Sequence, residues 1–190
     1  RKTLIKFDNV LNDQRHVVFS QRKKVISSKN IFEYSNEFLQ EVINELIKLK
    51  SKKNLDLKNN EFENKLKSLM GKNFDLSKAQ ILIKDSDKSL ENYLKDQFRL
   101  ARNERIKVLN NDRAQEIERR IFLQSIDLNW KSHIQYLEQL RQVIGLRSYG
   151  QRDPLIEYKK EAFELFENLL NKLKLDFITI LFNLKVNVKP

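Results

Sequence analysis

The sequence of 190 residues contains no cysteine, only three glycines and only two prolines. Without cysteine the chain can form neither disulfides nor thiolate metal sites, which is compatible with a reducing compartment. Because tight turns depend on glycine and proline, their scarcity argues against a sheet-rich fold. No apolar run approaches the roughly 20 residues of a membrane-spanning helix, and no signal-peptide pattern occurs. The first residue is Arg1, so we expect a piece of a longer chain.

Motifs of catalytic sites are missing as well. No Gly-x-x-x-x-Gly-Lys-Ser/Thr loop, which would cradle ATP phosphates, occurs in the sequence. His16 and His133 are isolated, whereas a metal needs several convergent ligands, so we interpret both as structural. Glu116 and Glu118 have the spacing of a helix surface, and nothing marks them as an acid/base pair. We therefore expect no catalytic residue, metal or cofactor in this chain, and no ATP hydrolysis by it.

Charge is the most abundant feature that remains. Charged residues make up 33% of the chain and give a formal net charge of +11, a composition typical of long, solvent-exposed helices. Residues 1–30 carry eight Lys or Arg against only Asp8 and Asp13, a surplus of six. Such a basic helix can face nucleic acid, anionic lipid or an acidic protein surface, or can simply be solvated.

Apolar residues at helical spacing predict an all-α fold. Residues 1–28 form one long helix in this interpretation, and shorter helices are expected at about 31–50, 59–70 and 88–110. We expect Gly71 to end the third of these and Ser86 or Ser89 to cap the fourth. Residues 73–87 are expected to be irregular, with a buried turn or short strand at 79–83. A small helical module at about 30–110 is thus inserted between the first helix and the rest.

Residues 112–190 predict two long helices joined as an antiparallel hairpin. Gly145 is expected to end the first helix in the left-handed conformation, Asp153 to cap the second and Pro154 to begin it. Trp130 is interpreted as a core residue. The apolar row of the first arm is Ile117, Ile121, Leu128, Ile134, Leu137 and Ile144, with Ile126, Trp130 and Leu140 beside it. That of the second arm is Leu155, Tyr158, Ala162, Leu165, Leu169, Leu173, Phe177, Ile180 and Leu184.

Four ordered segments of the sequence resemble one known family. They are RKTLIKFDNVLNDQR at residues 1–15, FSQR at 19–22, LQSIDLNWKSH at 123–133 and LRQVIGLRSYGQRDPLIEYK at 140–159. Together they are similar to the C-terminal region of the SecA family, the ATPases of bacterial preprotein export. The resemblance is strong over about residues 1–26 and 113–170 and weak between them.

The resemblance implies a division into a long scaffold helix at 1–30, a helical wing domain at 31–110, and a two-helix finger with the rest of the helical scaffold at 111–190. It implies that the tip of the finger enters the SecY channel and contacts the preprotein. The tip residues would be Leu146, Arg147, Tyr149, Gln151 and Arg152. Scaffold packing is expected from Leu4, Phe7, Leu11, Val18, Trp130 and Leu137.

The resemblance also implies what the remainder of such a protein would supply. ATP and Mg²⁺ would bind to motor domains that precede this segment, and the zinc-binding tail of the family is absent here. The expected partners are the SecY channel complex, the preprotein and the protein's own motor domains, with an anionic membrane surface as a further candidate. The expected location is the cytoplasm, peripherally associated with the bacterial inner membrane.

Two other classes of protein fit part of the sequence. A basic helical module that binds nucleic acid would explain the net charge, but no recognised motif occurs and aromatic residues are not interleaved with the basic ones for stacking. A free-standing coiled-coil scaffold would explain the helices, but heptads are not sustained and the tight Asp153-Pro154 connection argues against a long dimer. We therefore expect no nucleic-acid partner.

Overall fold

The computed structural model describes the backbone of residues 2–53, 61–147 and 153–187, and the side chains of 6–52, 61–146 and 153–187. Over these ranges the chain forms α-helices and one 3₁₀ turn without any strand, so the all-α prediction is confirmed. The elements are α1 (Lys2–Ser27), α2 (Ile31–Lys53), α3 (Glu61–Met70), η1 (Gly71–Asn73), α4 (Leu76–Lys84), α5 (Asp87–Leu109), α6 (Asn111–Arg147) and α7 (Pro154–Asn183). Within the described residues, none of these helices is long and apolar enough to cross a membrane.

The chain divides into two compact units, and α6 and α7 contribute residues to both. Unit 1 comprises residues 1–29 and 120–173, and unit 2 comprises residues 30–119 and 174–190. The division into scaffold, wing and finger that the family resemblance implied stays a prediction.

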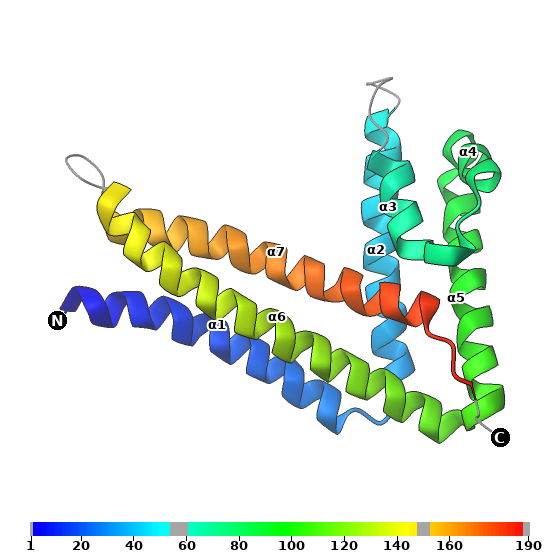
Figure 1. The fold of residues 1–190 in the computed structure, drawn as a ribbon, viewed down its shortest axis with the longest axis horizontal. Helices are drawn as coiled ribbons and strands as arrows, with labels where there is room; N and C mark the ends of the chain where they lie inside the picture. The colour runs from blue at the N-terminus through cyan, green and yellow to red at the C-terminus, as the bar shows by residue number, and fades with distance from the viewer. Residues whose placement is uncertain (1, 54–60, 148–152, 188–190) are drawn as a thin grey trace. The chain divides into compact units, whose positions relative to one another are not determined.

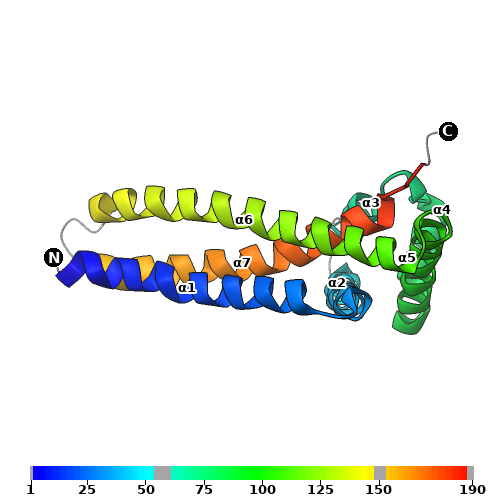
Figure 2. The same cartoon turned by 90° about the horizontal axis from the view of Figure 1, so that it is seen from below.

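Unit 1 is a bundle of three helices. Figures 1 and 2 both show the unit 1 segments of α1, α6 and α7 lying side by side, with α6 and α7 running in opposite directions. Their apolar faces meet in a core formed by Phe7, Leu137, Leu140, Ile144, Tyr158 and Ala162. The ring of Phe7 meets that of Tyr158 edge to face, with 4.9 Å between centroids. Burial of such large aromatic and aliphatic side chains is the main source of stability for three helices in contact.

Unit 2 is built around α2 and α5. Helix α2 packs against α3 and α5, and α4 packs against α5. The last turns of α7 belong to this unit, where Phe177 contacts Phe38 and Phe182 contacts Phe98, at centroid distances of 6.2 and 5.3 Å. Lys174 of α7 also pairs with Glu41 of α2 at 2.6 Å.

Local capping explains where several helices begin. Asn30 accepts a hydrogen bond from the backbone N–H of Phe32, and Ser86 accepts one from Ser89, as an N-cap residue does. Of the two serines expected to cap α5, Ser86 does so. The cap expected at Asp153 is also confirmed, since Asp153 accepts from the N–H of Leu155 at 2.9 Å. Asn110 has a positive φ of 73° with an extended ψ of 170°, and it separates α5 from α6.

Gly71 occupies the one turn in the described chain where glycine is required. Its φ is +56°, and a Cβ built on it would lie 2.4 Å from Oδ1 of Asn183, the last residue of α7. The amide of that asparagine donates to the carbonyl of Leu69 at 3.0 Å and to that of Thr179 at 2.8 Å. Helix α3 therefore ends against the end of α7, and Gly71 ends α3 as predicted.

Two local predictions were wrong. The segment expected to be irregular contains α4, whose N-cap is Asp75: its carboxylate accepts from the N–H groups of Ser77 and Lys78. This cap and the buried pair Ala79 and Leu82 stabilise a short helix. The prediction failed because two apolar residues three positions apart in so short a segment fit a turn as well as a helix. Gly145 lies inside α6 without a positive φ, because the helix continues past it to Arg147.

The buried row of α6 also differs from the predicted one. It advances by threes and fours through Ala114, Glu118, Phe122, Ile126, Trp130, His133, Leu137, Leu140 and Ile144. Leu128, which we had placed in the row, is 69% exposed, and Ile180 of α7 is 40% exposed. The prediction failed because Glu118 and His133 occupy core positions. A buried row chosen from apolar residues alone omits these two and includes apolar residues of the adjacent helix face instead.

Candidate functional site

The expected finger tip lies at the junction of α6 and α7, and the structure describes it only in part. The side chain of Arg147 and all of Tyr149, Gln151 and Arg152 lie outside the described residues. Leu146, in the last turn of α6, is 80% exposed, the largest exposure among the large apolar side chains described.

One face of α6 leads up to this junction without carrying a charge. We call it the uncharged face, and it consists of Leu128, Ser132, Gln135, Tyr136, Gln139, Gln142, Val143 and Leu146, all of them exposed. Residues 128, 132, 135, 139, 142 and 146 follow one another at steps of four and three, so they share one side of the helix. At 1.5 Å per residue the face extends over about 27 Å. In a chain with 33% charged residues, so long an exposed stretch without charge is unusual.

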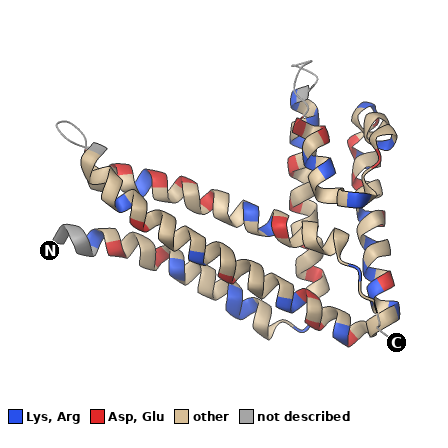
Figure 3. Ribbon diagram, viewed as in Figure 1, with Lys and Arg blue, Asp and Glu red and all other residues tan. Residues whose placement is uncertain are grey.

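The neighbouring helix offers a contrast within the same unit. Exposed positions of α7 include Lys159, Lys160, Glu164 and Glu167, and charged residues recur along this helix in Figure 3. Charges of both signs keep a helix surface hydrated. The uncharged face instead combines apolar side chains with glutamine amides, which can donate and accept hydrogen bonds.

The residues expected to pack the scaffold occupy unit 1. Phe7, Val18, Trp130 and Leu137 are buried, and Leu11 packs against the core while partly exposed. The side chain of Leu4 lies outside the described residues. Their contribution to a larger scaffold stays a prediction.

Tyr158 and Arg141 complete this part of the core. Burial raises the pKa of the Tyr158 hydroxyl, and the nearby guanidinium of Arg141 partly opposes that rise. Arg141 itself pairs with Asp8 at 3.0 Å and lies over the ring of Phe7, with 5.6 Å to its centroid. These contacts connect α1 and α6 at the edge of the apolar cluster.

A buried polar connection, which we call the histidine link, joins the three helices of unit 1. Nε2 of His133 lies 2.7 Å from Oε1 of Gln14, and the amide of Gln14 donates to the carbonyl of Ala162 at 3.1 Å. Because the amide oxygen can only accept, Nε2 of His133 carries the hydrogen. Burial lowers the pKa of His133 from 6.5 to about 4, so the ring is neutral at pH 7. The rings of Trp130 and Phe166 lie beside it, at 5.6 and 5.8 Å.

A second buried polar group, which we call the arginine cluster, lies in unit 2 and consists of Arg102, Arg105 and Glu118. Glu118 accepts from Nε of Arg102 at 3.0 Å and from Arg105 at 3.3 Å. Its other oxygen accepts from the hydroxyl of Ser35 at 2.9 Å. The Glu118 and Arg105 side chains are 0% and 1% exposed, so these charges are removed from water.

The remaining donors of the cluster reach α2 and α7. Arg105 donates to the carbonyl of Leu181 at 2.7 Å, near the end of α7 where carbonyls lack helical partners. Arg102 donates to the side-chain oxygen of Asn36 at 3.0 Å and lies over the ring of Phe32, 4.2 Å from its centroid. Desolvation lowers the pKa of Arg105, while Glu118 opposes that shift. Two cations share one carboxylate, so the cluster holds a net positive charge.

Neither buried group was predicted from the sequence, although the spacing contained a signal for the arginine cluster. Arg102 and Arg105 continue the buried row of α5 after Leu90, Leu94 and Phe98 at steps of four and three. Glu118 lies midway between Ala114 and Phe122 in the buried row of α6. Opposite charges at core positions of two different helices indicate a buried ion pair. Among the described residues, no group of three or more His, Cys, Asp or Glu could hold a metal.

Comparison with known proteins gives consistent matches along the whole chain. A family model described as the SecA Wing and Scaffold domain matches residues 1–185. The protein translocase subunit SecA of Pelagibacter ubique (strain HTCC1062) is 63% identical over 190 residues, which are 100% of this chain and 22% of that protein. The subunit of the same name from Caulobacter vibrioides is 38% identical over 181 residues, covering 92% of this chain and 19% of that protein.

A more distant relative agrees. The protein translocase subunit SecA of Thermodesulfovibrio yellowstonii is 34% identical over 186 residues, covering 98% of this chain and 20% of that protein. The chain therefore spans about a fifth of the length of these curated relatives.

Proposed function

This chain belongs to the SecA wing and scaffold family, and we propose that its α6–α7 junction contacts the polypeptide during ATP-driven export. The observation that carries the proposal is the uncharged face of α6, which leads over about 27 Å to the exposed Leu146. A surface that accepts many different polypeptides cannot match the charges of any one of them. Apolar side chains with glutamine amides satisfy this requirement, because they contact apolar groups and backbone amides alike.

Tyr149 is the proposed contact residue of the tip. A tyrosine ring covers apolar surface, and its hydroxyl can stay hydrogen-bonded to water or to a carbonyl. The neighbours Ser148 and Gly150 are small and would leave the ring accessible to a passing chain. Leu146, Arg147, Gln151 and Arg152 would flank this contact and face the SecY channel.

The rest of the mechanism is assigned to parts of the protein outside these residues. We propose that ATP and Mg²⁺ bind to motor domains in the other four-fifths of the length of the relatives, and that the three-helix bundle of unit 1 is the scaffold on which they dock. The translocase would act in the cytoplasm and at the surface of the inner membrane. The purified 190-residue chain should then lack ATPase activity, and activity above a contamination control would contradict this assignment.

Photo-crosslinking tests the proposed contact directly. A photoreactive amino acid replaces Tyr149 in the full-length translocase, which is supplied with membrane channel and a stalled preprotein. We expect crosslinks to the preprotein or the channel. A matched probe at Glu164, exposed on α7, should give far fewer.

A second variant separates contact from folding. Tyr149→Ala should leave the helical circular dichroism signal unchanged and slow preprotein movement. Normal translocation by Tyr149→Ala, with crosslinks only inside the chain, would show that the tip has been misassigned.

A further inference from the structure

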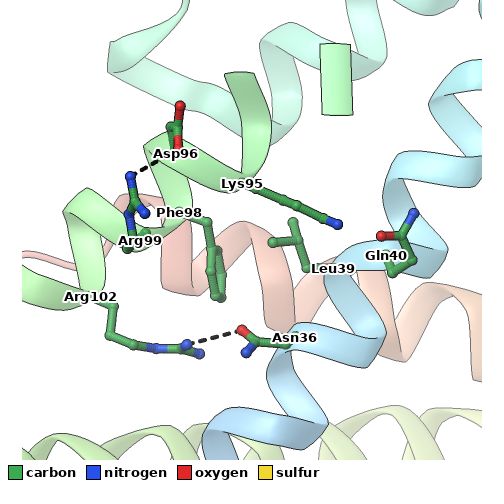
Figure 4. Close-up of a pocket in the computed structure, with 8 residues that line it drawn as sticks. All are labelled: Asn36, Leu39, Gln40, Lys95, Asp96, Phe98, Arg99 and Arg102. Carbon is green, nitrogen blue, oxygen red and sulfur yellow. Dashed lines mark hydrogen bonds and ion pairs between the residues drawn. The ribbon is translucent and has the colours of Figure 1, made fainter. Parts of the chain in front are cut away.

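A groove of about 380 Å³ lies between α2 and α5, entirely within unit 2. Its floor is apolar: Figure 4 shows the side chains of Leu39 and Phe98 pointing into the space between the two helices. The volume lies in the range of pockets that bind small ligands or single side chains of a partner. The groove shares no exposed residue with the uncharged face of α6.

The α5 wall of the groove is basic. Lys95, Arg99 and Arg102 follow one another at steps of four and three, so they share one side of α5, and Asp96 is the only carboxylate that lines the groove. A ligand with negative charge therefore meets complementary charge on this wall.

The three cations are held to different degrees. Arg102 is committed to Glu118 and Asn36. Lys95 pairs with Glu91 at 2.7 Å and is 46% exposed. Arg99 pairs only with Asp96 of its own helix among the described contacts, at 3.0 Å, with side chains 69% and 59% exposed. Such an exposed pair contributes little to stability, so Arg99 can turn to another carboxylate at little cost.

The α2 wall adds a neutral donor. Because the side-chain oxygen of Asn36 accepts from Arg102, the other atom of the same amide, its NH₂ group, remains a donor at the groove. The groove thus presents an apolar floor with hydrogen-bond donors on both sides. An arginine fork binds a carboxylate through two parallel hydrogen bonds, which fixes orientation as well as charge.

We propose that this groove binds a short acidic segment of a protein partner. One apolar side chain of the segment enters the groove and lies over Leu39 and Phe98, and an adjacent carboxylate pairs with Arg99 and Lys95. The proposal does not depend on the finger-tip assignment, because it concerns other residues of another unit.

Fluorescence polarisation with the full-length translocase tests the proposal. The probe is the labelled peptide Glu-Leu-Phe-Glu-Glu, and two matched peptides replace either the three glutamates by glutamine or Leu-Phe by Ser-Ser. We expect saturable binding of the first peptide and at least tenfold weaker binding of both others. Arg99→Glu should weaken the first peptide at least tenfold.

The control variant is Lys107→Glu, which makes the same charge change at an exposed position of α5 and should alter binding less than twofold. Circular dichroism checks that both variants are folded. If Arg99→Glu does not fold, the two altered peptides still test the proposal, because they are compared on the unmutated protein. Equal binding of the glutamine peptide, equal loss in both variants, or no binding up to millimolar peptide would each overturn the proposal. Displacement of the peptide by a DNA duplex of unrelated sequence would also count against it, since general attraction to the basic chain would then suffice.

Discussion

The histidine link of unit 1 and the arginine cluster of unit 2 place polar groups where three or more helices meet, but with different chemistry. In the histidine link, neutral groups on α1, α6 and α7 satisfy one another through two hydrogen bonds. In the arginine cluster, one carboxylate on α6 holds two guanidinium groups on α5, and these reach α2 and α7. Helix α6 supplies His133 to the histidine link and Glu118 to the arginine cluster, and these two residues are fifteen positions apart (133 − 118).

This difference in chemistry determines how the histidine link and the arginine cluster respond to mutation and to pH. Removing one partner from a neutral buried hydrogen bond costs about 1–3 kcal/mol, whereas leaving a buried charge without its partner costs about 3–5 kcal/mol. The histidine link also titrates, because its ring is neutral only above a pKa of about 4. The arginine cluster should respond to mutation more strongly, and the histidine link to pH.

The largest expected effect is that of Glu118→Ala. This change leaves two buried guanidinium groups without their shared carboxylate and should lower the free energy of unfolding of unit 2 by about 3–5 kcal/mol. Urea denaturation followed by circular dichroism measures the loss, and hydrogen exchange of the α2 and α5 amides locates it in unit 2.

Glu116→Ala is the matched control, two residues away on the same helix. The Glu116 side chain is 49% exposed and pairs with Arg119 of its own helix, so its loss should cost at most about 1 kcal/mol. Equal losses in the free energy of unfolding for the two variants would mean that the buried ion pairs of the arginine cluster contribute no more than an exposed pair.

Simple periodicity was sufficient for much of the fold. The helices α1, α2, α3 and α5 lie close to their predicted ranges. Periodicity failed in α6, because the buried row there includes the polar residues Glu118 and His133. The predicted row omitted both of them and included the exposed Leu128 instead. Whether a polar residue in a helix is buried depends on a partner from a distant part of the chain, such as Arg102 or Gln14, and local spacing does not contain that information.

The second effect is a pH dependence of unit 1. Between about pH 4 and pH 6.5 the folded protein keeps His133 neutral while the unfolded chain binds a proton there. Lowering the pH through this window therefore favours unfolding, so the stability due to His133 is fully present above pH 6.5 and is lost toward pH 4. The loss should reach about 3 kcal/mol, measured by urea denaturation at a series of pH values.

The His133→Gln variant isolates this contribution from the titration of carboxylates. Its amide can still donate to Gln14 but does not titrate, so its stability should fall less steeply than that of the parent over the same pH window. Parallel pH profiles of the two proteins would contradict the depressed pKa of His133. An NMR titration of the imidazole measures that pKa independently.

The smallest effect should come from an exposed ion pair between the same helices as the histidine link. Arg22 of α1 and Asp127 of α6 lie 3.1 Å apart, with side chains 38% and 57% exposed. A double-mutant cycle with Arg22→Ala and Asp127→Ala should give a coupling of about 0.2–1 kcal/mol that decreases with salt. A coupling above 2 kcal/mol would show that solvent exposure does not distinguish weak ion pairs from strong ones in this protein.

The candidate site divides in a similar way between what sequence could and could not predict. The tip residues were assigned by family resemblance alone, and most of them lie outside the described residues. The uncharged face of α6 could have been recognised from the spacing of Leu128, Gln135, Gln139 and Leu146. It was missed because Leu128 had been counted as core, and this same error hid both the buried row and the exposed face.

The contact between Gly71 and Asn183 has a consequence for the order in which the chain can fold during synthesis. These residues are 112 positions apart (183 − 71), and at about 5–20 residues per second the ribosome needs roughly 6–22 s to make the second after the first. Unit 2 also needs α7 residues after position 173, and unit 1 needs residues up to 173 to complete the three-helix bundle that α1 begins. Neither unit can therefore close as soon as its first half emerges. The apolar faces of the early helices therefore stay exposed until α7 has been synthesised. During this period a nascent-chain chaperone would find the largest apolar surface to bind.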